Sequence, residues 1–268
     1  MRQHCSPARL LASAALTAIL AAGLGGCQTM SDITGSLTSK AETSPSPDTD
    51  PRRAAELYGE RYRANPKDPD AALAYGQALR ATGQRGQAVA VLEQATLAHP
   101  GNKALLAGYG RALADNGNFQ QSFDVLTRAH SPDNPDWRIL SVQGTTLDQL
   151  GRHEDARRYY ASALKIVPDQ PSVLSNLGLS YVLSKDLPKA EENLRRAYAS
   201  GKSDARVRQN LGLVVGLQGS FAEAESIVKA DLPPDEAASN VAYLRQMLSR
   251  KDNPRAGTMP VASLNRPD

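Results

Sequence analysis

The sequence predicts an all-α protein built as a solenoid of paired helices, and its periodicity supports this fold class. Glycines recur every 34 residues, at positions 76, 110, 144, 178 and 212. Given the first glycine, four more in register have a chance on the order of 10⁻⁵ at average glycine usage. A small residue follows each glycine by twelve positions, and an apolar residue follows it by sixteen. Such a period is typical of stacked helical repeats.

Each unit is predicted to form two antiparallel helices joined by a tight turn. Glycine in the first helix and a small residue early in the second allow close approach, while the apolar residue fills the remaining space. A second glycine ends the first helix in four units, because glycine takes the left-handed cap conformation without steric cost. These cap residues are Gly83, Gly117, Gly151 and Gly219. In the fourth unit this turn contains Lys185 without a cap glycine.

This pattern resembles the tetratricopeptide repeat, which has the same period of about 34 residues. The resemblance implies a right-handed α-solenoid with five units: 69–102, 103–136, 137–170, 171–204 and 205–238. Because a terminal repeat needs a cover for its apolar face, we expect a half-repeat at 51–68 and an amphipathic capping helix at 239–251. The tail at 252–268 is expected to be disordered.

The segment 1–26 has the form of a bacterial lipoprotein signal peptide. Arg2 and Arg9 precede an apolar run at 10–24 that is too short for a stable transmembrane helix. The run ends in Leu-Gly-Gly-Cys, which resembles a lipobox and implies a lipid on Cys27. An ordinary signal peptide with an incidental cysteine is the alternative. Residues 27–50 are rich in Ser, Thr, Asp and Pro and are predicted to form a disordered tether.

Charge and motif content argue against several function classes. The chain has 31 Lys and Arg against 28 Asp and Glu, or 29 against 28 without the two leader arginines, which gives little electrostatic basis for binding nucleic acid. His99, His130 and His153 fall in different units without metal-ligand spacing. We predict no catalytic residue, metal, cofactor or small-molecule substrate, and expect that the chain is not an enzyme.

The repeat resemblance implies a concave groove in which the first helices bind a partner polypeptide. Its inward positions hold Gln77, Arg80, Arg111, Arg138, Asn176, Leu179, Arg206, Gln209, Asn210 and Leu213. We expect the groove to be polar at its N-terminal end and more apolar later. The asparagines could bind a peptide backbone or only cap and solvate the helix face. The arginines could pair with an acidic partner segment or form a solvated surface.

The leader, tether, half-repeat, five units and closing helix together resemble the TadD-like lipoproteins of the tight-adherence (Tad, or Flp) pilus system. The nearest likeness lies in Asn-Leu-Gly-Leu at 210–213 and Asn-Val-Ala-Tyr at 240–243. The resemblance implies a pilotin or scaffold that is lipid-anchored at the outer membrane, faces the periplasm, and binds the secretin or other pilus components. One alternative is an adaptor lipoprotein of another envelope machine, such as a type IV pilus secretin pilotin or a scaffold for proteases or cell-wall hydrolases. Another is an unrecognised envelope enzyme.

Overall fold

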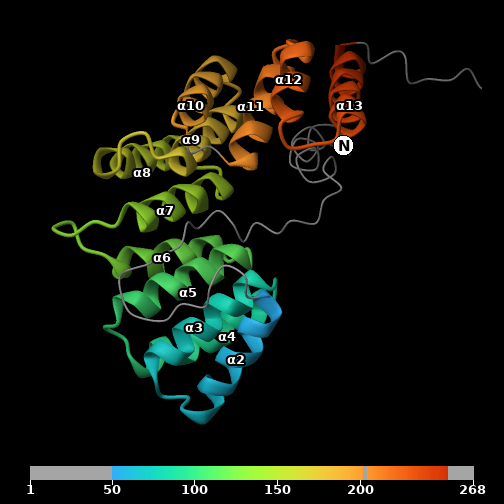
Figure 1. Cartoon of the computed structure of the whole chain (residues 1–268). Coiled ribbons are helices and arrows are strands. Elements are labelled where there is room, and N and C mark those ends of the chain that lie inside the picture. The colour runs from blue at the N-terminus through green and yellow to red at the C-terminus, as the bar shows by residue number, and fades with distance from the viewer. Residues whose placement is uncertain (1–49, 202–203, 253–268) are drawn as a thin grey trace, which may run out of the picture.

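The computed structural model describes residues 50–201 and 204–252, where every regular element is an α-helix (Figure 1). The predicted all-α solenoid is therefore confirmed. The proposed signal peptide, Cys27, the tether up to residue 49 and the tail from residue 253 lie outside the described residues.

Helices of two kinds alternate along the described chain. The first helices are α3 (Pro69–Ala81), α5 (Lys103–Asp115), α7 (Trp137–Gln149), α9 (Pro171–Leu183) and α11 (Ala205–Leu217). The second helices are α4 (Arg85–Ala98), α6 (Phe119–Ala129), α8 (His153–Ile166), α10 (Leu187–Ala199) and α12 (Phe221–Val228). Helix α2 (Pro51–Ala64) precedes the first pair, and α13 (Pro234–Asp252) follows the last. The first helices begin at equal intervals along the chain, as the glycine period requires.

Side-chain caps fix the starts of most first helices. Asp68, Asn102, Asp136 and Asp204 each accept a hydrogen bond from a backbone amide two or three residues further on. Such a cap satisfies an amide that has no partner within the helix. Helix α9 instead begins with Pro171, whose missing N–H and fixed φ suit a first helical position. The boundaries thus follow from local sequence as well as from packing.

The turns after the first helices require a left-handed residue. Gly83, Gly117, Gly151 and Gly219 have φ between 75° and 91°, which confirms their predicted role as caps. Lys185 occupies the same place in the fourth unit with φ of 62°. The same turn therefore forms without glycine, at a conformational cost that the other four units avoid.

The periodic glycines lie where the two helices of a unit meet. A Cβ atom added at Gly144 would lie 2.5 Å from Cε1 of Tyr160, and one at Gly76 would lie 2.5 Å from Cγ of Leu92. In the second unit, Ser122 donates a hydrogen bond of 2.6 Å to the backbone oxygen of Gly110 across the same contact. These contacts confirm the predicted close approach.

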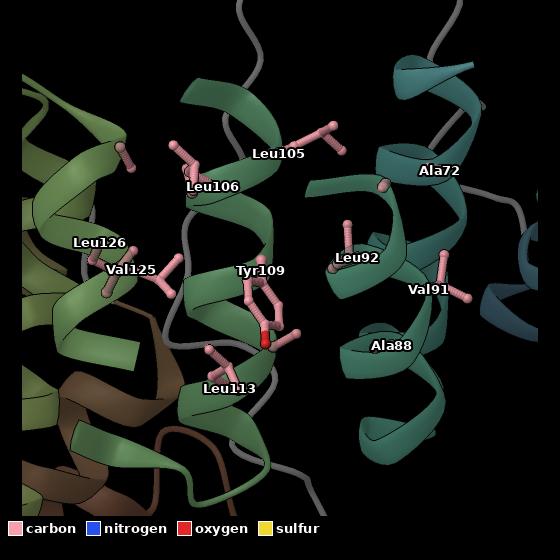
Figure 2. Close-up of a cluster of buried hydrophobic side chains, with 14 of the residues drawn as sticks. Ala72, Ala88, Val91, Leu92, Leu105, Leu106, Tyr109, Leu113, Val125 and Leu126 are labelled. Atoms are coloured by element: carbon pink, nitrogen blue, oxygen red, sulfur yellow. The ribbon is translucent and has the colours of Figure 1, made fainter. Parts of the chain in front are cut away.

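Apolar side chains from consecutive helices form a core along the stack that is divided into successive clusters. Figure 2 shows its N-terminal part, where Leu92 of α4 and Leu126 of α6 lie on either side of α5. Further clusters join α7 with α8 and α9, and α10 with α11 and α12. Each helix pair is thus covered mainly by its neighbours, as expected for a solenoid.

Contacts between helices of the same kind explain the curvature of the stack seen in Figure 1. Each first helix contacts the next one directly, from α3 to α11. Successive second helices have no comparably extensive contact within the described residues. Because the first helices lie closer together, they occupy the inner side of the curve. We call the surface formed by α3, α5, α7, α9 and α11 the first-helix face.

The C-terminal end differs from the sequence expectation. Helix α13 begins at Pro234, five residues before the capping helix expected at 239–251 and inside the segment assigned to the fifth unit. Proline suits a first helical position, and Asp235 and Glu236 in the first turn favour its positive dipole end. Leu244 packs close to Gly216 of α11, so α13 covers the last unit. No helix in the described ranges combines the length and apolar character that a membrane span needs.

Candidate functional site

All ten predicted contact residues lie on the first helices, but their exposure differs. Gln77 is exposed, Arg80 and Arg111 are buried, and the other seven are half-buried. Some of these side chains therefore belong to the framework of the stack, while others remain accessible. Their role in partner binding stays a prediction.

Arg80 is held in the framework by an ion pair. Its Nε atom lies 2.6 Å from Oδ2 of Asp115, and the two side chains are only 9% and 12% exposed. The pair connects α3 with α5, the first helices of neighbouring units. Removing one member would leave the other as a poorly compensated charge, so the pair contributes to the structure of the face itself.

Arg111 lies one helical turn before Asp115 and has no matching acid. It is 4% exposed, and its Nε and Nη2 atoms have no hydrogen-bond partner. Burial and the nearby charge of Arg80 lower the pKa of Arg111 to about 10, although Asp136 and Asp115 act in the opposite direction. The guanidinium is therefore still charged at neutral pH. Its burial contradicts the interpretation of this arginine as part of a solvated surface.

Arg138 provides a second guanidinium beside Arg111. Its Cζ atom lies 4.6 Å from the ring centroid of Trp137, and its Nε has no hydrogen-bond partner. Asp136 caps α7, and its Oδ1 accepts the backbone N–H of Arg138 at 2.8 Å. Asp115 accepts a hydrogen bond from Arg80 and Asp136 accepts one from the α7 backbone, so both acids near Arg111 already have a partner. The N-terminal part of the face carries two arginines whose donors are incompletely filled.

The two predicted asparagines link neighbouring first helices. Asn176 donates from Nδ2 to Oγ of Ser141 at 3.2 Å, and Asn210 donates to Oγ of Ser175 at 2.9 Å. Both amides are half-buried. They are therefore neither helix caps nor freely solvated groups. Each still has a second N–H and a carbonyl oxygen with which a partner backbone could bond.

The C-terminal part of the face carries leucines that are only partly covered. Leu179 and Leu183 on α9, with Leu213 and Leu217 on α11, are all half-buried and so keep part of their surface in water. Arg206 pairs with Asp204 at 3.3 Å, and the two side chains are 41% and 54% exposed. Such an exposed pair contributes little to stability, which fits the solvated interpretation of this arginine.

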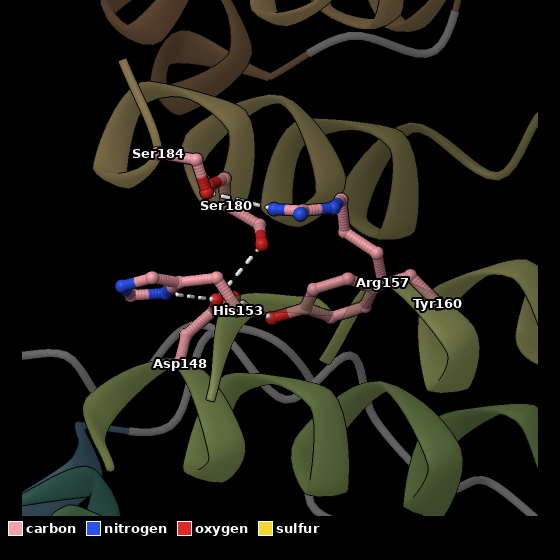
Figure 3. A network of polar contacts seen from close by, with 6 residues as sticks. All are labelled: Asp148, His153, Arg157, Tyr160, Ser180 and Ser184. Atoms are coloured by element: carbon pink, nitrogen blue, oxygen red, sulfur yellow. Dashed lines mark hydrogen bonds and ion pairs between the residues drawn. The ribbon is translucent and has the colours of Figure 1, made fainter. Parts of the chain in front are cut away.

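A buried carboxylate joins three helices in the middle of the stack (Figure 3). Asp148 of α7 accepts hydrogen bonds from Oη of Tyr160 at 2.9 Å and from Oγ of Ser180 at 2.8 Å. Nδ1 of His153 lies 2.9 Å from its Oδ1 atom. Burial and the adjacent carboxylate raise the pKa of Tyr160 well above its ordinary value. The repeat period predicts a packing role for Tyr160 and does not connect it with Asp148.

This network does not have the arrangement of a hydrolase triad. The Ser180 hydroxyl donates to the carboxylate of Asp148, whereas a nucleophilic serine must donate to a histidine nitrogen. His99 and His130 lie elsewhere, with Nε2 2.8 Å from the Lys67 carbonyl oxygen and 3.1 Å from Oε1 of Gln143. Within residues 50–201 and 204–252, no three His, Cys, Asp or Glu side chains form a group that could hold a metal.

Comparisons with known proteins identify the repeat. Two tetratricopeptide-repeat models match residues 48–111 and 141–205. The BBSome complex member BBS4 of Bos taurus is 23% identical over 155 residues, which cover 58% of this chain and 30% of that protein. Tetratricopeptide repeat protein 8 of Caenorhabditis elegans is 23% identical over 163 residues, covering 59% and 32% respectively. The match thus spans about a third of the length of these relatives.

Solved structures agree on the fold. The crystal structure of PilW, described as a widely conserved type IV pilus biogenesis factor, has a TM-score of 0.63 and 19% identity, and the match covers 72% of this chain and 91% of PilW. The hetero-tetramer Cut9–Hcn1 of the APC/C has a TM-score of 0.62 and 17% identity, with 77% and 41% covered. Together with the repeat models, these similarities show a tetratricopeptide-repeat solenoid, a fold whose repeats bind protein partners.

Proposed function

We propose that this tetratricopeptide-repeat solenoid is a non-enzymatic scaffold of the bacterial envelope that holds a partner polypeptide on its first-helix face. The observation that carries the proposal is the composition of that face. It combines Arg111 and Arg138, whose donors are not filled by the fold, with leucines on α9 and α11 that stay partly in water. Charged groups, amides and apolar surface placed along one curved face suit an extended polypeptide better than a small molecule.

The proposed attachment to the envelope derives from the sequence. A lipid on Cys27 and a tether up to residue 50 would hold the solenoid near a membrane while allowing it to reach its partner. Confinement at a surface raises the effective concentration of a partner in the same envelope. Chemistry at a catalytic centre is not needed for this role.

The more specific proposal is a pilotin-like factor of Tad (Flp) pilus assembly at the outer membrane. It is supported by the resemblance of leader, repeats and closing helix to TadD-like lipoproteins. PilW, a type IV pilus biogenesis factor, shares the fold over most of its length, which supports the same kind of role at the level of architecture. An adaptor of another envelope machine is the alternative, and the identity of the bound partner separates the two.

Site-specific crosslinking in cells tests this function. A photo-reactive amino acid replaces Gln77, which is exposed on the first-helix face. The matched control carries it at Leu97, which is 79% exposed on the second helix α4. We expect the secretin or another Tad component to be attached from position 77 and not from position 97. Proteases or cell-wall hydrolases attached from position 77 would assign the adaptor role instead. Identical products from both positions would contradict binding on the first-helix face.

A further inference from the structure

We infer that Arg111 and Arg138 bind a carboxylate of the partner, and that the leucines of α9 and α11 bind an apolar side chain farther along the same partner segment. This inference rests on the proposed function, because it specifies the chemistry of the polypeptide held on the first-helix face. It predicts a partner segment that is extended, acidic at one end and apolar at the other.

The argument starts from the contrast between Arg111 and two other arginines of the first helices. Arg80 has Asp115 as its partner, and Arg208 has Asp231, with Nε and Oδ2 2.6 Å apart. Arg111 is more deeply buried than Arg208 and has no acid within hydrogen-bond distance. A buried charge without a partner is strongly unfavourable. Unfilled buried groups of this kind need an explanation, and a ligand that fills them in the complex supplies one.

The pattern of open donors specifies the ligand. Nε and Nη2 of Arg111 lie on the same edge of the guanidinium, so their N–H bonds are nearly parallel. A carboxylate accepts two such bonds with its two oxygens, which is the strongest common geometry for this pair. The open Nε of Arg138 provides a further donor close by. Both nearby aspartates already have other hydrogen bonds, with Asp115 accepting from Arg80 and Asp136 from the α7 backbone.

Binding requires a small rearrangement, because protein atoms cover the open edge of Arg111. The inferred movement is that of the Arg138 side chain, which is half-buried and lies over the Trp137 ring instead of pairing with an acid. When it turns outward, it exposes Arg111 and can donate to the same carboxylate. The arriving negative charge compensates both guanidiniums, which repel each other in the free protein.

Helix spacing gives the distance between the two anchor points. The carboxylate site lies between α5 and α7, and the leucines lie between α9 and α11, two steps further along the stack. Packed helices are about 8–10 Å apart, so the anchors are separated by roughly 16–20 Å. An extended chain advances about 3.3 Å per residue, so the acidic and apolar residues should be about five or six positions apart. Asn176 and Asn210 lie between or beside these anchors, with amide groups available for the intervening backbone.

Peptide binding tests the two-anchor inference directly. The probe is a fluorescent nine-residue Ser/Thr peptide with blocked ends, one glutamate, and a leucine six positions after it. The protein is the full-length chain purified in detergent, and the readout is fluorescence anisotropy. We expect binding that weakens about tenfold or more when glutamine replaces the glutamate, since hydrogen bonds to charged groups contribute most. Moving the leucine to three positions from the glutamate should also weaken binding, but by less than the replacement of the glutamate. Equal binding of the acidic and glutamine peptides would overturn the inference.

Protein variants locate the site and separate ligand binding from a structural role. Arg111→Met and Arg111→Lys should both lose about tenfold or more in affinity, because neither side chain has the two-donor edge. Arg158→Met is the matched control, since that arginine is 77% exposed on α8, and it should bind normally. Arg111→Met should also melt at an unchanged or higher temperature, because it removes an uncompensated buried charge.

The outcomes are distinct. Unchanged peptide affinity in Arg111→Met would refute the carboxylate site, and a clearly lowered melting temperature would show that the arginine serves the fold instead. Either result leaves the crosslinking test of the scaffold untouched, because that test identifies the bound protein from position 77 independently of Arg111.

Discussion

Replacing Lys185 with glycine should stabilise the protein, because the other four units have a glycine at the left-handed position of this turn. The backbone N–H of Lys185 donates to the Val182 oxygen at 2.9 Å, and the corresponding bond of Gly151 to the Asp148 oxygen is 3.0 Å. The next residue donates back to the helix at 2.9 Å in both turns, from Asp186 and from Arg152. The turns therefore have the same geometry, and they differ in whether the left-handed residue carries a Cβ atom.

The size of the effect follows from two opposing contributions. A left-handed conformation costs a non-glycine residue roughly 1–2 kcal/mol. Glycine increases the entropy of the unfolded chain, which offsets about 0.4–1 kcal/mol of that gain. At the midpoints of these two ranges, the Lys185→Gly variant should thus gain about 0.8 kcal/mol. For a chain of this size, 1 kcal/mol shifts the melting temperature by about 2–4 °C, so we expect an increase of roughly 1–4 °C.

Thermal unfolding followed by circular dichroism measures this shift, and two further variants control for its cause. Lys185→Ala removes the exposed side chain but keeps the Cβ atom, so it should show no comparable gain. Gly151→Lys places lysine in the preceding turn and should lower the melting temperature by a similar amount. If Lys185→Ala were as stabilising as Lys185→Gly, the gain would come from the loss of the side chain, and the argument from backbone conformation would be refuted.

Three other changes have clear expected results. Gly144→Ala should destabilise the protein by about 1–3 kcal/mol, because the new Cβ atom would contact the Tyr160 ring. Gly86→Ala should stabilise it by up to about 1 kcal/mol, because no atom lies within 4 Å of the new Cβ. If both variants shifted the melting temperature in the same direction, this argument would be contradicted. Tyr160→Phe should cost about 1–2 kcal/mol by removing a donor to Asp148, while Tyr243→Phe, at a side chain 49% exposed, should have no effect in urea denaturation. Cys27→Ala should release the protein from membranes in detergent-free fractionation, and full retention would speak against the proposed lipid anchor.

The repeat could be predicted from sequence because the close helix contact allows few residue types. A larger side chain at Gly144 would overlap the Tyr160 ring, so a glycine is needed once per unit and reveals the period. The turn at Lys185 was the exception, since a left-handed turn tolerates other residues at moderate cost. The early start of α13 also follows from local chemistry, because Pro234 favours a helix start that the repeat register placed later.

The burial of individual side chains on the first-helix face could not be predicted. Position in the repeat indicates that Arg111 points toward the inner side, but neighbouring units determine whether it is covered or paired. Its exposure therefore depends on three consecutive first helices, which no local pattern describes. The bond between Asp148 and Tyr160 could not be predicted for a related reason. The packing role of the ring was evident from the period, whereas its hydroxyl acquires a partner only through the tertiary contact.

The unequal packing along the stack has a mechanical consequence. The two helices of a unit pack on each other more extensively than α6 packs on α7, α8 on α9 or α10 on α11. Under a pulling force, the joints at α6–α7 and α8–α9 should therefore yield before the helix pairs on either side of them. The solenoid would then widen or narrow its curve at these joints while the helix pairs stay intact.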